Sequence, residues 1–493
     1  MSTNSKSVIK KINNSLLNKE VSCQELTSKY LKEIKSSELN AYVTICEEEA
    51  LNSAKKVDEK ISAGEKISLL EGIPMTLKDN ISTRGIETTC SSKILKGYKP
   101  IYDATVWSGL KEENAVLLGK TNMDEFAMGS SCETSFIGGA KNPHNLNHVS
   151  GGSSGGVASA VAGNIAAYGL GSDTGGSVRQ PSSFCGVVGL KPTYGSVSRY
   201  GLVAYASSLD QIGPIGKTVE DVSIVFDSIA KYDPKDSTSN PNSKFNTQST
   251  LNESIKGLKL GIPKEYYEGV DSEISQAIEK AMDEYKSMGV EIEYFDLPEI
   301  KFALPVYYVL ACAEATSNLA RFDGVRYGYR TSNYKDVDEM ICKTRSEGFG
   351  KEVKRRILLG NYVLSSGYYN DYYKKAQDLR GVIVDAFDRA FDKFDLLLTP
   401  TSPVTAFPMN KTYENPDEAY LADICTVPIN IAGIPALSLP CGFDSNSLPI
   451  GMQIIGQRFS EAKILNLAHQ FEKHTEFKYD KDLDMGVKIW NMN

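Results

Sequence analysis

The sequence predicts an α/β fold formed by one large domain. Short apolar runs broken by glycine and proline begin near residue 70, alternate with segments of small residues, and are typical of buried strands in an α/β sheet. Similar runs return near the C-terminus, after a long helix-forming region. The two groups of strands are therefore expected to belong to one domain. A chain of 493 residues is long enough to bury a core of that size.

The N-terminal part of the chain, residues 1–66, is predicted to be a helical segment. Between residues 5 and 60, apolar residues recur at three- and four-residue spacing among many lysines and glutamates. Ser22 precedes Glu25 by three residues, which is the spacing of a capping box and predicts a helix start. The strand-like runs that follow are GIPMTLK, AVLLGKT, AAYGLGSD and CGVVGLKP.

The second half of the chain has similar strand-like runs on both sides of a helical region. Residues 233–253 are polar, contain proline and predict a surface loop. Helix formers dominate residues 305–395, which predicts several helices lying over the sheet. The remaining segments are a helix, SEISQAIEKAMDEYKSMG, and the strand-like runs GLKLGIPKEYY, VEIEYFDLP, FDLLLTPTSP, NIAGIPALSLP and PIGMQIIG.

Charge and cysteine content narrow the classes of protein to which the chain can belong. A net charge of -8 argues against this chain being the main nucleic-acid-binding surface, because phosphate binding needs clustered lysine and arginine. Nine cysteines without a C-x-x-C pair predict reduced thiols rather than disulfides or a zinc site. The N-terminus does not resemble a signal peptide, and no apolar run is long enough to span a membrane. We therefore expect a cytoplasmic protein.

The stretch SGGSSGG at residues 150–156 has three interpretations. A linker is disfavoured because the small apolar segment VASAVAGNIAAYGLG follows at once, and a phosphate loop lacks its lysine. The pattern G-x-S-x-G at Gly151, Ser153 and Gly155 also occurs in serine hydrolases that use a histidine base. The downstream histidines, His469 and His474, lie in a helix-like segment, so this third interpretation has little support.

A second serine, Ser177, follows two glycines in GSDTGGS. Such a turn lets successive backbone N–H groups point at a developing oxyanion. With histidine disfavoured as the base, lysine becomes the candidate, as in serine–lysine catalytic sites. Lys78 ends the apolar run GIPMTLK, where burial would favour the neutral amine that can accept a proton.

The segments GIPMTLKDN, SGGSSGG, GSDTGGS and FCGVVGLKPTYG, in this order, resemble the amidase signature family. The resemblance implies a single amidase-type domain with a central mixed β-sheet covered by helices on both faces. It also implies a Ser-cisSer-Lys triad. In that triad Ser177 is the nucleophile, Ser153 relays the proton from a cis peptide bond after Gly152, and Lys78 is the base. The implied oxyanion hole consists of the backbone N–H groups of Thr174, Gly175, Gly176 and Ser177.

Within this family, the blocks TNMDEFAMGSS, GSDTGGSVRQP and GLVAYASSLDQIGP are most similar to the glutamine-hydrolysing subunits of tRNA-dependent amidotransferases. This resemblance implies that Arg356 binds the α-carboxylate of glutamine and that Asp423 binds its α-ammonium group. Gly129, Ser130 and a tyrosine from the pair Tyr307 and Tyr308 are expected to line the pocket. Free glutamine carries both charges, so its site needs a buried cation and a buried anion placed to pair with them.

The same resemblance implies two partners and no cofactor in this chain. A large subunit would bind tRNA and use ATP with Mg²⁺, and a small subunit would join the two larger ones. The ammonia would amidate Glu-tRNA(Gln), Asp-tRNA(Asn) or both. Three alternatives are a stand-alone amidase for another small amide, a non-catalytic scaffold subunit, and a serine–histidine hydrolase.

Overall fold

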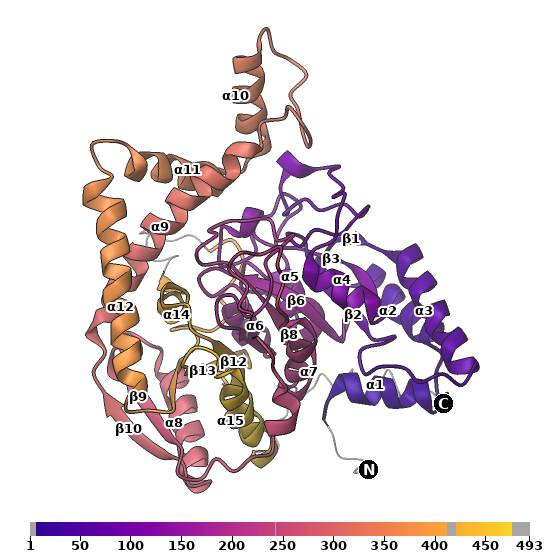
Figure 1. Ribbon diagram of the computed structural model, residues 1–493, viewed down its shortest axis with the longest axis vertical. Helices are drawn as coiled ribbons and strands as arrows, with labels where there is room; N and C mark the ends of the chain where they lie inside the picture. Colours follow the sequence, from indigo (N-terminus) through magenta and orange to yellow (C-terminus); the bar gives the residue numbers. More distant parts are fainter. Residues whose placement is uncertain (1–5, 242, 412–420, 476–493) are drawn as a thin grey trace.

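The centre of the molecule is one mixed sheet of eleven strands in the order β1-β3-β2-β6-β8-β7-β12-β13-β11-β9-β10 (Figure 1). The computed structural model describes residues 6–241, 243–411 and 421–475. The strands of this sheet are β1 Tyr42–Ile45, β2 Pro74–Lys78, β3 Val116–Thr121, β6 Tyr168–Asp173, β7 Val188–Lys191, β8 Gln211–Gly216, β9 Lys259–Pro263, β10 Glu291–Phe295, β11 Leu396–Pro400, β12 Ala436–Phe443 and β13 Pro449–Gly456. A separate two-stranded sheet pairs β4 Lys141–Asn142 with β5 Asn145–Val149.

The helices come from all parts of the chain. The α-helices are α1 Val8–Leu17, α2 Cys23–Ser36, α3 Glu47–Ser62, α4 Thr105–Glu112, α5 Gly155–Ala162, α6 Arg179–Cys185, α7 Val219–Ile229, α8 Ser272–Ser287, α9 Ala303–Asn318, α10 Val337–Gly348, α11 Lys351–Leu364, α12 Lys375–Phe391, α14 Val427–Ala432 and α15 Glu461–His474. The short 3-10 helices are η1 Lys93–Leu95, η2 Glu125–Ala127, η3 Thr247–Thr250, η4 Lys264–Tyr267, η5 Pro298–Phe302 and η6 Leu319–Arg321, and η7 Asn370–Lys374 is a π-helix.

Parallel pairing near one end of the sheet brings the key segments together. Strand β2 lies between β3 and β6 and runs parallel to both, with Leu77 opposite Leu170. The carboxyl ends of parallel strands meet at the same edge of a sheet. Lys78, the last residue of β2, is therefore next to the end of β6, where the chain enters the turn at residues 174–177.

Helices cover both faces of the sheet, because neighbouring residues on its strands enter different cores. On β11, Leu396 and Leu398 belong to a core shared with α1, α2, α3, α7, α8 and α15. Leu397, between them, belongs to the core shared with α9, α11, α12 and α14. Successive side chains of a strand point to opposite faces, which explains this alternation. The predicted α/β domain with a mixed sheet covered on both faces is confirmed.

Two regions differ in detail from the sequence-based prediction. Within the N-terminal segment predicted as helical, Tyr42–Ile45 form the edge strand β1, antiparallel to β3. This run consists of aromatic and β-branched residues, which favour strands over helices. In the predicted loop at 233–253, Asp233 accepts hydrogen bonds from Thr105 Oγ1 at 2.5 Å and from Ser198 Oγ at 2.7 Å. The described part of this loop also contains the short helix η3.

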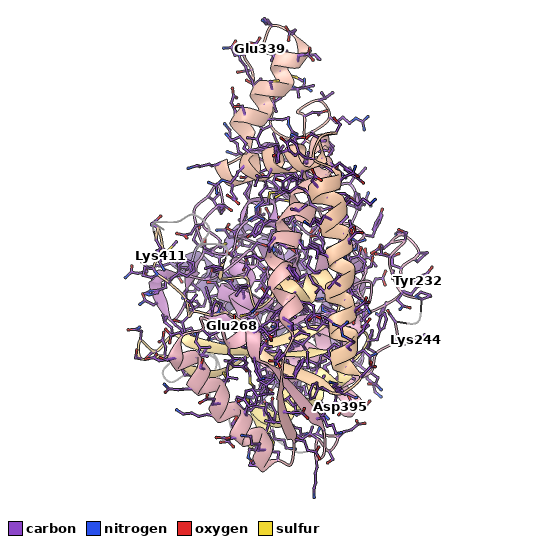
Figure 2. The ribbon with its side chains drawn as sticks, turned by 90° about the vertical axis from the view of Figure 1, so that its left-hand side faces the viewer. Tyr232, Lys244, Glu268, Glu339, Asp395 and Lys411 are labelled. Carbon is purple, nitrogen blue, oxygen red and sulfur yellow. The ribbon has the colours of Figure 1, made fainter. Side chains whose placement is uncertain are left out.

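Helices α9, α11 and α12 lie together on one side of the molecule, and α10 projects away from its body (Figure 1). Figure 2 shows this projection from another side, with Glu339 on α10. The capping box predicted at Ser22 and Glu25 is present at the start of α2. Each cysteine is a free thiol, and no helix in the described ranges has the length and apolar character needed to span a membrane.

Candidate active site

Lys78 is fully buried at the end of β2 and contacts three serines. Its Nζ lies 2.7 Å from Ser153 Oγ and 2.9 Å from Ser154 Oγ. On the neighbouring strand β6, Ser172 Oγ lies 3.0 Å and Ser172 O lies 3.1 Å from Nζ. Burial lowers the pKa of Lys78 to about 7, although Asp124 and other carboxylates act in the opposite direction. A large fraction of this amine is therefore neutral near pH 7.

The hydrogen bonds around Nζ leave its lone pair available to Ser153. The Ser154 hydroxyl donates to Ser172 O at 3.1 Å, so its oxygen accepts from Nζ. A neutral amine has two hydrogens and one lone pair. When its hydrogens are donated to Ser154 and Ser172, the lone pair faces the Ser153 hydroxyl. The arrangement places a base in direct contact with a serine.

Residues 150–154 form a tight turn before α5, which we call the cis-serine turn. Its Gly152–Ser153 peptide bond is cis, as the family resemblance implies. Gln180 of α6 holds the turn, because its Oε1 accepts from Gly152 N at 2.9 Å while its Nε2 donates to Ser130 O at 2.9 Å. A Cβ added at Gly152 would lie 2.0 Å from Asp124 Oδ2, so only glycine fits here.

Residues 174–177 connect β6 to α6, and we call them the glycine turn. Ser154 N donates to Ser177 O at 3.1 Å, which joins this turn to the cis-serine turn. The Ser177 side chain has 7% exposure, and its Oγ makes no hydrogen bond within the described part of the chain. The structure therefore brings Lys78 and Ser153 into direct contact, whereas Ser177 joins them through backbone contacts.

The predicted oxyanion hole needs one correction, at Gly176. Its N–H already donates to Asp173 Oδ1 at 2.8 Å, so this group is not free to bind a substrate oxygen. The N–H groups of Thr174, Gly175 and Ser177 have no hydrogen-bond acceptor among the described residues. Three of the four predicted donors therefore remain available.

Asp173 organises the glycine turn because it is itself held by Arg179. The guanidinium donates to both carboxylate oxygens, each at 3.0 Å, and both residues are fully buried. Burial alone would raise the pKa of Asp173, but the adjacent Arg179 charge overrides it and holds this pKa below its usual range. The ionised carboxylate accepts from Gly176 N and, at 3.1 Å, from Val178 N, which shapes the turn.

Arg356 is a buried cation with fixed orientation. It belongs to α11, has 5% exposure, and donates through Nε to Glu352 at 2.9 Å and through Nη1 to Tyr205 Oη at 2.5 Å. Its guanidinium carbon lies 5.3 Å from the ring centre of Tyr308. Stacking and hydrogen bonding together give a planar group suited to a carboxylate. The alternative, a solvated charge on a helix surface, does not fit this burial.

The two tyrosines of α9 have different surroundings. A Cβ added at Gly175 would lie 2.8 Å from Tyr307 Cζ, so the Tyr307 ring packs directly against the glycine turn. Tyr308 stacks instead on Arg356, and the two rings meet edge to face with centres 5.1 Å apart. Tyr307 is thus the one that borders the glycine turn.

Asp423 is half-buried and lies near the same turn. Its backbone oxygen accepts from Thr426 Oγ1 at 3.0 Å, and the same hydroxyl donates to Gly175 O at 2.7 Å. Burial raises the pKa of the Asp423 carboxyl to about 8, while the charge of Arg356 acts in the opposite direction. A cation bound beside it would favour the ionised form.

The remaining predicted pocket residues, Gly129 and Ser130, are half-buried, and Ser130 is linked to the cis-serine turn through Gln180. A Cβ at Gly129 would lie 2.3 Å from Asp124 Oδ1, so Asp124 supports this loop as well as Gly152. Asp124 Oδ2 also accepts from Cys132 N at 2.9 Å. The predicted site residues therefore form one connected region.

Three of the four histidines lie beside groups outside the proposed site. His469 lies 3.8 Å from Glu472 on α15, and His474 lies 3.3 Å from Glu284 on α8. His144 contacts Cys185 O at 3.1 Å. None of these contacts involves Ser153 or Ser177, which disfavours the serine–histidine interpretation.

Several residues of the site were missed at the sequence level. Ser172 and Asp173 are polar residues at the end of a predicted strand, directly before a glycine-rich turn. That pattern could have identified both as site residues. Tyr205 has no comparable signal, because its role depends on α11, which is far away in the sequence. The missed residues are Asp124, Ser154, Ser172, Asp173, Gln180 and Tyr205.

A family model described as amidase matches residues 25–465. Among relatives, the A-subunit of glutamyl-tRNA(Gln) amidotransferase from Agathobacter rectalis is 54% identical over 463 residues, which cover 93% of this chain and 92% of that protein. The protein of the same name from Caldanaerobacter subterraneus is 55% identical over 462 residues, with 93% and 94% coverage.

Two solved structures are also similar to this chain. A crystal structure of the glutamyl-tRNA(Gln) amidotransferase A-subunit from Thermotoga maritima is 40% identical, with a TM-score of 0.78 and coverage of 95% of this chain and 96% of that one. The peptide amidase of Stenotrophomonas maltophilia is 26% identical, with a TM-score of 0.81 and coverage of 97% and 98%. The fold is thus shared by enzymes with different amide substrates.

Proposed function

The chain belongs to the amidase family, and we propose that it is the glutamine-hydrolysing subunit of a tRNA-dependent amidotransferase. In this proposal it releases ammonia from glutamine, and a partner subunit uses the ammonia to amidate Glu-tRNA(Gln), Asp-tRNA(Asn) or both. Relatives with more than half of their residues identical carry the name of the A-subunit of such an enzyme. That name supports a complex of several subunits.

The first chemical step is attack of Ser177 Oγ on the γ-carboxamide carbon. Ser153 accepts the Ser177 proton while it gives its own proton to neutral Lys78. The contact of 2.7 Å between Lys78 Nζ and Ser153 Oγ supports this relay. The N–H groups of Thr174, Gly175 and Ser177, which have no acceptor among the described residues, would bind the oxyanion as it forms.

The second step breaks the carbon–nitrogen bond. The proton held by Lys78 returns through Ser153 to the departing nitrogen, which leaves as ammonia, and a γ-glutamyl ester remains on Ser177. Water then attacks the ester with the same relay, and glutamate is released. Each step moves one proton along the same path, so no other general base is needed.

Recognition of glutamine would use the two charged groups beside the glycine turn. Arg356 would bind the α-carboxylate in its planar, stacked orientation, and Asp423 would bind the α-ammonium group. The raised pKa of Asp423, about 8, would fall as the substrate cation arrives. Tyr307 and the Gly129–Ser130 loop would complete the pocket.

The proposed partners follow from the family resemblance and from the need for an acceptor of the ammonia. Ammonia is useful only if an activated carboxyl group receives it, and that activation would take place on a large tRNA-binding subunit with ATP and Mg²⁺. A small third subunit would join the two in a heterotrimer. This chain itself would need no cofactor for hydrolysis, and its net charge of -8 is consistent with tRNA binding mainly to the partner.

The observation that carries the proposal is the buried Arg356, which is held by Glu352, Tyr205 and Tyr308. Tyr308 contacts Tyr307, and the Tyr307 ring packs against the glycine turn. An amidase for uncharged amides has no need of a cation buried in this position. The alternative is a stand-alone amidase, and it is favoured by the likeness to peptide amidase.

The test compares ammonia release from glutamine with release from a panel of neutral amides, using the natively purified chain and whatever co-purifies. Ser177→Ala should lower glutamine hydrolysis by about 10⁴–10⁶-fold. Ser159→Ala is the matched control, because Ser159 is buried on α5 but bonds Lys141 O. Selective glutamine hydrolysis by a three-subunit complex supports the proposal. Hydrolysis of neutral amides by an unaccompanied chain would instead identify a stand-alone amidase.

A further inference from the structure

Asp210 is a buried carboxylate that the proposed reaction does not use. It directly precedes β8 and has 2% exposure. Its Oδ1 accepts from Thr174 Oγ1 at 2.6 Å, and its Oδ2 accepts from Tyr205 N at 2.9 Å and Ala206 N at 3.1 Å. One side chain therefore holds the first residue of the glycine turn with one oxygen and the segment around Tyr205 with the other.

The Tyr205 segment leads directly to Arg356. Tyr205 Oη accepts from Arg356 Nη1, so the backbone that Asp210 holds also places the hydroxyl that orients the guanidinium. Asn318 Nδ2 of α9 donates to Tyr205 O at 3.2 Å and adds a second anchor. Asp210 thus stands between two functional parts, the oxyanion-binding turn and the carboxylate-binding arginine.

We propose that Asp210 is a positioning residue that fixes the separation between the glycine turn and Arg356, and that this separation selects glutamine over asparagine. The inference rests on the proposed function. Glutamine has one methylene more than asparagine between its α-carbon and its carboxamide. With both ends of the site held in place, asparagine bound to Arg356 would hold its carboxamide farther from Ser177 than glutamine does, because its side chain is one methylene shorter.

The contacts of Asp210 suit this role because both carboxylate oxygens accept hydrogen bonds and the side chain is buried. A misplacement of about 1 Å at a reacting group costs on the order of 100-fold in rate. A methylene difference in substrate length is worth about 10–200-fold in discrimination. Loss of the Asp210 hydrogen bonds should therefore lower kcat/KM for glutamine more than it lowers kcat/KM for asparagine.

The experiment measures kcat/KM for glutamine and for asparagine with the complete complex. Asp210→Ala removes the hydrogen bonds to the glycine turn and to the Tyr205 segment. It should lower the ratio of kcat/KM for glutamine to kcat/KM for asparagine by about tenfold. Asp210→Asn should recover most of the ratio, because an amide can accept from the two backbone N–H groups and donate to the Thr174 hydroxyl. Thr174→Val removes the same contact from the other side with little change of volume, and Thr174→Ser should regain part of what Thr174→Val loses.

Asp221→Ala is the matched control. Asp221 is fully buried, accepts from the Ser7 hydroxyl at 2.6 Å and from Ile9 N at 3.0 Å, and lies on α7. It should lower the unfolding temperature without changing the ratio. The inference is overturned if Asp210→Ala and Thr174→Val both keep the wild-type ratio, if Asp210→Asn falls as far as Asp210→Ala, or if Asp221→Ala changes the ratio equally. A wild-type complex that hydrolyses neither amino acid would contradict the proposed function instead.

Discussion

At the scale of one residue, burial gives Lys78 a property that an exposed lysine lacks. A lysine on the surface is a charged donor, but at the end of β2 it has lost its water and faces three serines. Loss of hydration disfavours the charged form and lowers the pKa of the amine to about 7. The same residue type thus changes from a cation into a base because of its position alone.

This change predicts the pH dependence of glutamine hydrolysis. The relay needs neutral Lys78, whose fraction falls as the pH drops through about 7, so kcat at saturating glutamine should fall below pH 7 and level off above it. Lys78→Arg, which stays protonated, should lose about 10²–10⁴-fold at every pH. Ammonia release measured from pH 5 to pH 9 checks both. A flat profile for the wild-type protein, or an active Lys78→Arg variant, would contradict this role.

Substitution of Arg356 should weaken glutamine binding far more than it slows the chemical step. Arg356→Lys keeps a positive charge but loses the planar fork and the stacking on Tyr308. The KM for glutamine should rise by about 10–100-fold, with a much smaller change in kcat. Steady-state kinetics of the variant give both values. Arg355→Lys is the control, because Arg355 lies on the same helix but is exposed, so this variant should keep the wild-type KM.

At the scale of elements, the loop that contains η2 and the start of α11 depend on each other. Glu125 Oε2 accepts from Gly350 N at 2.8 Å, and Gly350 is the N-cap of the helix that carries Arg356. The adjacent Asp124 supports the cis-serine turn through Gly152 and the Gly129 loop. Two consecutive acids thus connect the proposed relay to the arginine on α11.

Glu125 also predicts how stability varies with pH. Burial raises the pKa of its carboxyl from 4.5 to about 7, so between these values the folded state binds more protons than the unfolded state. The free energy of unfolding contributed by this group is therefore lost as the pH rises from about 4.5 to 7. Between pH 5 and pH 7.5, the free energy of unfolding of Glu125→Gln should therefore fall by roughly 2–4 kcal/mol less than that of the wild-type protein. Urea unfolding at pH 5 and pH 7.5 tests it, and parallel changes in the two proteins would refute it.

At the scale of the whole molecule, the N-terminal and C-terminal halves of the chain share one sheet. Strand β12 pairs with β7, and β13 and β11 continue the sheet beyond it. Buried Arg179 links these parts, because it donates to Asp173 at the end of β6, to Asn430 on α14 at 2.6 Å, and to Gln453 on β13 at 2.6 Å. The site therefore forms only when distant segments have assembled.

Arg179→Met should lower the free energy of unfolding by about 3–5 kcal/mol, because it leaves Asp173 as a buried charge without its partner. Hydrolysis should fall as well, since Asp173 shapes the glycine turn. Adding Asp173→Asn to this variant should restore part of the stability, because the unpaired charge disappears. Denaturant unfolding of the two variants is the measurement. A double variant no more stable than Arg179→Met would contradict this explanation.

Much of the fold and of the candidate site followed from local sequence. The buried strands were predicted from apolar runs, and the capping box at Ser22 and Glu25 from spacing alone. Strand β1 was missed because four strand-forming residues lie between two strongly periodic helices. The motifs around Ser153 and Ser177 identified both turns, because glycine at a tight turn has a steric cause that the sequence states directly.

The sequence by itself determined which residue types occur and which local turns form, and thus the serines, the lysine and the family. Only the tertiary structure decided what those groups do to one another. It placed Lys78 against Ser153, used the Gly176 N–H for Asp173, placed Tyr307 on the glycine turn, and buried Arg356 against Tyr205. The physical reason is that pKa shifts and hydrogen-bond competition depend on distance and burial, and the residues involved lie far apart along the chain.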